Sequence, residues 1–152
     1  MQELRELFNK IMMHIGITGP EGEEVSKTFF NQVYAIFVER LLKLNLPDET
    51  FNKRIKEYQE YIKDGKHDLV HNDVKHYMNK ESGKLFAESF LKHLKFFAHG
   101  LKDKGDITAE QVREIGEILK AHIQNRQAVN KVQNVENQGE ALQNLAGTNS
   151  SF

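Results

Sequence analysis

Cysteine is absent from the 152-residue sequence, and proline occurs only at Pro20 and Pro47. Without cysteine the chain can form no disulfide bond, no thiol nucleophile and no cysteine-ligated metal site. The same absence fits a reducing compartment. Pro20 stands where a helix is expected to begin, and Pro47 stands just after the expected end of that helix.

Long apolar runs are also missing. The most apolar stretch, residues 28–46, contains three side-chain amides and three charged side chains. A membrane-spanning helix needs about 20 mostly apolar residues in a row. The segment before Ile17 carries Glu3, Arg5, Glu6 and Lys10, so it lacks the apolar core of a signal peptide. We therefore expect no membrane span and a soluble, cytoplasmic protein.

Neither sign of charge is in excess. The 21 Lys and Arg residues nearly balance the 22 Asp and Glu residues, which leaves a net charge of −1. Such a chain has no overall attraction to nucleic acid or to an anionic membrane. Its 39% hydrophobic and 28% charged residues are typical of one globular domain with a real core.

Segments that alternate apolar and polar residues are missing too, so nothing predicts a β-strand. Apolar residues recur instead at intervals of three and four, which is the spacing of a helix with one buried face. The predicted helices cover about residues 4–15, 20–46, 48–63, 82–101 and 109 to beyond 123. The fold class is therefore all-α, a compact bundle of five or six helices.

Two segments leave alternatives open. Residues 64–81 form either a short helix or a long, partly ordered connection, because few apolar residues mark a face there. Residues 124–152 hold six Asn and five Gln, a composition typical of a disordered tail. A faint three-four rhythm also allows a helix that forms only with a partner. We therefore divide the chain into a helical bundle domain, 1–123, and a polar C-terminal tail or partner-dependent helix, 124–152.

The stretch from Gly100 to Gln111 resembles the loop of an EF-hand calcium site. Aligning Gly105 with the conserved turn position places Lys102 and Lys104 where calcium ligands belong and leaves the bidentate glutamate missing. The start of a helix explains the residues in this stretch better than a calcium loop does. Thr108 and Gln111 have the spacing of a capping box, and the residues at 107 and 112 have that of a hydrophobic staple. We expect a helix cap and no calcium.

Histidines gather between residues 67 and 99, which hold five of the seven. His67, Asp68 and His71 have the spacing of weak metal-ligand candidates. Polar segments of this kind are mostly solvated surface, and no H-E-x-x-H or E-x-x-H motif accompanies them. We find no nucleophile elbow and no phosphate-binding glycine loop. We therefore expect no cofactor and favour a protein without enzymatic activity.

Aromatic pairs at 29–30 and 96–97 offer another choice. With Met12, Met13 and Met78 they could line an apolar ligand cavity. We expect them to pack in the core instead, because they fall on helical stripes. Phe37 and Phe90, central on the two most apolar helices, should be buried.

One helix face stands out by its charge. Residues 75–104 carry seven Lys against three acidic residues, whereas residues 1–24 carry two basic against five acidic residues. Within the predicted helix 82–101 and its end, a polar stripe recurs at three and four residues opposite the apolar one. Its candidate interaction residues, called here the basic face, are Lys84, Lys92, Lys95, His99 and Lys102, with Glu88 among them. The stripe is either a solvated helix face or a docking face for an acidic partner or for phosphates.

These patterns predict a non-catalytic helical interaction or regulatory protein with an unidentified protein partner. One alternative is a small metal- or ligand-binding protein, with or without enzymatic activity, that uses the His67–His71 segment. A weaker alternative is a nucleic-acid-binding accessory protein that uses the basic face, which the absence of arginine from that face disfavours.

Overall fold

The computed structural model describes the backbone of residues 2–133 and the side chains of residues 2–126. Within that range the chain forms six α-helices and one short 3₁₀ helix, with no strand, which confirms the all-α prediction. The helices are α1 (Gln2–His14), α2 (Gly19–Asn45), α3 (Asp48–Lys63), α4 (His67–Val74), η1 (Lys75–Tyr77), α5 (Ser82–Asp103) and α6 (Ala109–Gln133).

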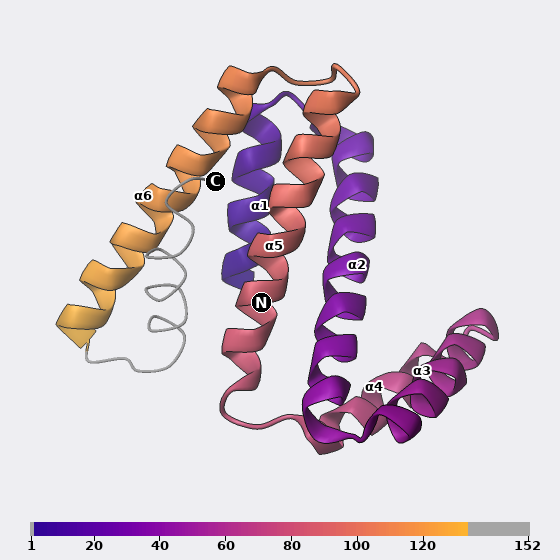
Figure 1. Cartoon of the computed structure of the whole chain (residues 1–152). Helices are drawn as coiled ribbons and strands as arrows, with labels where there is room; N and C mark the ends of the chain where they lie inside the picture. Colours follow the sequence, from indigo (N-terminus) through magenta and orange to yellow (C-terminus); the bar gives the residue numbers. More distant parts are fainter. Residues whose placement is uncertain (1, 134–152) are drawn as a thin grey trace.

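The antiparallel pair α2 and α5 forms the centre of the molecule (Figure 1). Phe30 of α2 stacks on Phe90 of α5, and further along α2 the ring of Phe37 meets Phe86 edge to face. Residue numbers therefore increase along α2 in the direction in which they decrease along α5, so the two helices are antiparallel. α1 and α6 pack at one end of this pair, and α3 and α4 lie together at the opposite end.

Two hydrophobic clusters follow from this arrangement. The first core contains an aromatic group contributed by α1, α2 and α5, in which Phe8 stacks on Phe29 with ring centroids 4.2 Å apart. Aliphatic residues of α1 and α6 close it. The second core joins the later half of α2 to α3, α4 and the start of α5; its largest buried members are Phe37, Leu41, Leu42, Phe51 and Tyr58. Because α2 and α5 contribute to both cores, they connect the two ends of the fold.

Not every aromatic and methionine residue enters these cores. Phe29, Phe30 and Met12 are buried as expected, but Phe96 is 74% exposed and Met13 is 70% exposed. Met78 is also on the surface. The expectation that all of them pack inside was wrong for these three. Phe96 lies outside the stripe of Phe90, Leu94 and Phe97 that α5 turns toward the first core, so its ring stays on the surface.

The stretch that resembles a calcium loop is a corner between two helices. Gly105 adopts φ 82°, a backbone conformation that suits glycine. Its N–H donates to the Lys102 carbonyl at 3.0 Å, and the N–H of Asp106 donates to the Leu101 carbonyl at 2.9 Å. This pair of bonds is a Schellman motif, which satisfies the last carbonyls of α5. Both ends of the stretch resembling a calcium loop therefore belong to helices.

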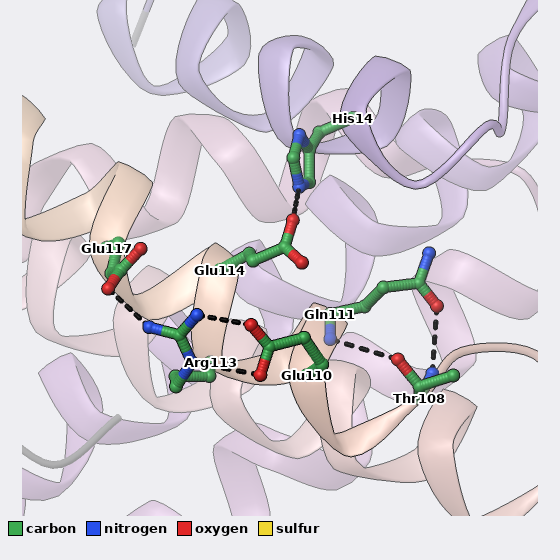
Figure 2. A network of polar contacts seen from close by, with 7 residues as sticks. All are labelled: His14, Thr108, Glu110, Gln111, Arg113, Glu114 and Glu117. Carbon is green, nitrogen blue, oxygen red and sulfur yellow. Dashed lines mark hydrogen bonds and ion pairs between the residues drawn. The ribbon is translucent and has the colours of Figure 1, made fainter.

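The predicted capping box begins α6 (Figure 2). The Gln111 N–H donates to Thr108 Oγ1 at 3.1 Å, and the Thr108 N–H donates to Gln111 Oε1 at 2.8 Å. Ile107 and Val112 are both buried, as a hydrophobic staple requires. The capping box is therefore confirmed.

Replacing Thr108 with alanine should lower the free energy of unfolding by about 1 kcal/mol, because the Gln111 N–H loses its acceptor at the start of α6. Thr108→Ser keeps the hydroxyl and serves as the matched control. Chemical denaturation of both variants measures the difference. An unchanged Thr108→Ala protein, or an equal loss in both variants, would contradict a stabilising role for the hydroxyl.

α6 packs on α1 through a buried apolar face and a line of polar contacts. Ile115, Leu119 and Ile123 are buried. On α1, His14 pairs with Glu114, as Figure 2 shows, and Glu3 pairs with His122 at 3.0 Å and Arg126 at 3.1 Å. These contacts involve residues near both ends of α1, so they link the two helices along most of the length of α1.

The helix α6 continues to Gln133, so the expected boundary between bundle and tail at residue 123 falls inside it. The alternatives for the tail cover residues 124–152. Of these, residues 124–133 belong to α6, and residues 134–152 lie outside the described residues.

The open segment 64–81 contains α4 and η1, so the helical alternative describes most of it. Polar contacts attach this segment to α3: Arg54 donates to Asp73 Oδ2 at 2.7 Å, and the buried Tyr58 hydroxyl donates to the same oxygen. Burial alone would raise the pKa of Asp73, but the hydrogen bonds from Tyr58 and Arg54 outweigh it and lower that pKa. Asp73 is therefore a carboxylate at neutral pH and holds α4 against α3.

Candidate interaction surface on α5

The basic face lies on α5, and its members differ in exposure. Lys92 and Lys95 are exposed, whereas Lys84, His99 and Lys102 are half-buried. Lys102 is thus less exposed than its position opposite the apolar stripe suggests. The exposed charge of this face is therefore concentrated near the middle of α5, at Lys92 and Lys95.

The acidic residue within the basic face has its own partner. Glu88 forms an ion pair with Arg40 of α2 at 3.2 Å. Arg40 also donates to the hydroxyl of Ser89 at 3.4 Å, and that buried hydroxyl donates to the Leu85 carbonyl at 2.8 Å. These contacts join α2 to α5 and bring an arginine beside the basic face from a helix that the sequence stripe did not include.

A surface groove lies between α2 and α5 next to Lys92. We call it the Phe96 groove; its volume is about 540 Å³. The lining residues are Ile36, Glu39, Arg40 and Lys43 from α2 and Lys92, His93 and Phe96 from α5. The lining therefore contains three cationic side chains and one carboxylate. It also contains the mostly exposed ring of Phe96.

His93 connects this groove to the first core. Its ring stacks against Phe96 with centroids 6.0 Å apart and lies 5.0 Å from the ring of the buried Phe29. His93 Nε2 donates to Gln32 Oε1 at 2.8 Å. Burial lowers the pKa of His93 below its ordinary value near 6.5, so the imidazole is mainly neutral at pH 7. His93 and Phe96 therefore contribute an aromatic and mainly neutral part of the groove lining, and Arg40, Lys43 and Lys92 contribute its cations.

The histidine candidates for a metal site lie elsewhere, on α4. His67, Asp68 and His71 are all exposed. The Tyr34 hydroxyl and His71 Nδ1 form a hydrogen bond of 3.0 Å. In the part of the chain that the structure describes, no three or more His, Asp or Glu side chains are grouped to hold a metal ion. His71 therefore has a structural contact that links α4 to α2.

Reasoning from the sequence missed Arg40, Lys43 and Phe96 as surface residues beside the basic face. A stricter use of helical periodicity could have found Phe96, because it falls outside the stripe of Phe90, Leu94 and Phe97. The two α2 cations could not be found in this way, since their position depends on how α2 packs against α5.

Within residues 2–133, no helix has both the length and the apolar character needed to cross a membrane. Comparison of the chain with family models, with curated proteins and with solved structures finds no match.

Proposed function

We propose that this chain is a non-catalytic interaction protein that binds an acidic protein partner through the basic face of α5. The observation that carries the proposal is the exposure of Lys92 and Lys95 together with the ring of Phe96 on one helix. Scattered exposed apolar residues are ordinary, but a large aromatic ring surrounded by exposed cations is typical of a docking site.

The two kinds of side chain serve different parts of binding. Exposed lysines attract an acidic surface and increase the rate of encounter, while contributing modestly to the final affinity. An aromatic ring that becomes buried on docking supplies much of the affinity. The combination supports a partner that offers carboxylates around an apolar anchor.

A protein partner fits better than a nucleic acid. Binding to nucleic acid gains its affinity from many phosphate contacts, whereas the chain as a whole has a net charge of −1. Arginine is the preferred residue for phosphate recognition, and Arg40 beside the basic face is already paired with Glu88.

Changing Lys92 and Lys95 together to glutamate should leave the fold intact, because both side chains are exposed. The same change should slow association with the partner at least about 10-fold, and added salt should have a similar effect on the unchanged protein. Partners are captured on the immobilised full chain from an extract of the cells that produce this protein. The association rate of each captured protein is then measured with the unchanged chain and with the double variant.

The matched control changes Lys53 and Lys56 of α3 to glutamate. Both are exposed, and the net charge changes by the same amount. Partners that depend on the basic face should bind this control as they bind the unchanged protein. Equal capture by all three proteins would refute the proposed role of the basic face.

A further inference from the structure

We infer that two adjoining grooves between α2 and α5 form one docking site for an amphipathic helix of the partner, with Phe96 and Leu44 as its two apolar contact points. This inference rests on the proposed function and deepens it. It adds a surface that includes α2, and it assigns the partner segment a shape and a charge distribution.

The second groove, called here the Leu44 groove, has a volume of about 320 Å³. Its lining includes Leu41, Leu44 and Asn45 from α2 and Lys84, Leu85 and Glu88 from α5. Glu88 lines this groove and Arg40 lines the Phe96 groove, and the two side chains form an ion pair at 3.2 Å. The two grooves therefore lie next to each other along the α2–α5 pair, with this ion pair between them.

The most exposed large apolar side chains of the described residues lie in these two grooves. Leu44 is 75% exposed and Phe96 is 74% exposed. Leu44 lies four residues after Arg40 in α2, and Phe96 lies eight residues after Glu88 in α5. Because the helices are antiparallel, these two steps lead in opposite directions from the ion pair. With a rise of about 1.5 Å per residue, the two contact points are separated by about 18 Å along the helices.

A helix spans this separation with its apolar residues on one side. Helical positions i and i+11 point in nearly the same direction and lie about 16 Å apart. An extended segment could cover the distance as well, but its backbone N–H and C=O groups would find no strand edge within residues 2–133 to pair with. A helix satisfies these groups internally, and a helix in a groove between two others is a common mode of recognition.

The charges along the two grooves are unequal. Arg40 and Glu88 balance each other in their ion pair. The other charged side chains are Lys43 and Lys92 against Glu39 in the Phe96 groove, and Lys84 against Glu81 in the Leu44 groove. Complementarity therefore requires acidic residues around the partner's anchor at Phe96 and no such excess around its anchor at Leu44.

A displayed library of random 16-residue peptides provides the probe for this inference. Peptides are selected on the immobilised full chain, with removal of those that also bind the Leu44→Ala/Phe96→Ala double variant. We expect the selected peptides to carry net negative charge and apolar residues at helical spacing over about three turns. Thermal denaturation should show that the double variant is as stable as the unchanged chain, because both side chains are mostly exposed.

Affinities of the selected peptides are then measured by fluorescence anisotropy. Phe96→Ala alone should weaken binding about 30-fold, the loss expected when an aromatic hot-spot residue is truncated. Lys43→Glu should weaken binding as well, although Lys43 lies on α2 and outside the basic face. The controls are Met13→Ala, which removes an exposed apolar side chain from α1, and Lys56→Glu, which changes the same charge on α3.

Several results would overturn the inference. They are a failure to select any peptide, selected peptides with positive charge or without helical spacing, and equal loss in the controls. Tighter binding of a 15-residue oligothymidine that also depends on Phe96 would assign the grooves to nucleic acid and would equally overturn it.

The failure of this inference can be distinguished from failure of the proposed function. If Lys92→Glu/Lys95→Glu abolishes capture of the natural partner while Leu44→Ala/Phe96→Ala does not, the basic face binds the partner outside the grooves. In that case partner binding through the charge of the basic face stands, without Phe96 as its anchor, and the inference is wrong. If neither double variant changes capture, both are wrong.

Discussion

Replacing Phe90 with alanine is expected to lower the free energy of unfolding by about 3–5 kcal/mol. The ring is completely buried in the first core. It stacks on Phe30 at 5.9 Å and meets Phe29 edge to face at 5.6 Å. Its removal would leave a cavity at the centre of an aromatic cluster that three helices share, where rigid rings cannot move far enough to fill the space.

The loss is large because a domain of this kind has a total stability of about 5–15 kcal/mol. Chemical denaturation monitored by circular dichroism measures it. Phe96→Ala, on the same helix, is the matched control, since that ring is largely exposed and its loss should change stability by less than about 0.5 kcal/mol. Similar stability for the two variants would contradict the central position of Phe90 in the core.

Most helix boundaries could be predicted from the sequence because they depend on local chemistry. Asp48, Ser82 and Ala109 begin helices at or near the predicted residues. Pro47 stops the preceding helix, and the box of Thr108 and Gln111 starts the last one. Caps and breakers act within a few residues, so their effect can be read without knowledge of the tertiary structure.

The segment around α4 could not be decided in the same way. Its eight residues are too short for a stable isolated helix. Tertiary contacts hold it: Asp73 receives hydrogen bonds from Arg54 and Tyr58, which lie 15 to 19 residues earlier in the chain. Such contacts leave no local pattern in the sequence.

The candidate site was predictable only where it depends on one helix. Periodicity placed the lysines of the basic face together on α5. It could not show that Arg40 pairs with Glu88, which is 48 residues away in the sequence, or that Lys43 lines the same groove as Lys92. Grooves arise from the packing of two helices, so helical periodicity alone cannot reveal them.

The division into two cores was likewise not predicted, although Phe37 and Phe90 were both expected to be buried. The two rings lie in different clusters, and this leads to different expectations for their removal. Phe37 is 3% exposed and meets Phe86 edge to face at 5.4 Å in the second core. Around it, α3 and α4 pack against the later half of α2.

Phe37→Ala should also lower the free energy of unfolding by about 3–5 kcal/mol, but its effect should be strongest at one end of the fold. α3 and α4 contain few buried residues, and those residues belong to the second core, which attaches both helices to α2. We therefore expect amide hydrogen exchange to accelerate more in α3 and α4 than in α1 and α6. Phe90→Ala should accelerate exchange chiefly in α1 and α6, because those helices close the first core.

The comparison of these two variants tests whether α2 and α5 transmit a loss of packing from one core to the other. Each helix contributes buried residues to both clusters, but the backbone hydrogen bonds of a helix are local and can persist when packing at one end is weakened. Hydrogen exchange at neutral pH, followed by mass spectrometry, measures protection helix by helix. Equal acceleration in all helices for both variants would show that the two cores unfold as a single unit. Acceleration confined to the end that carries the substitution would show that the α3–α4 end can open while the α1–α6 end stays folded.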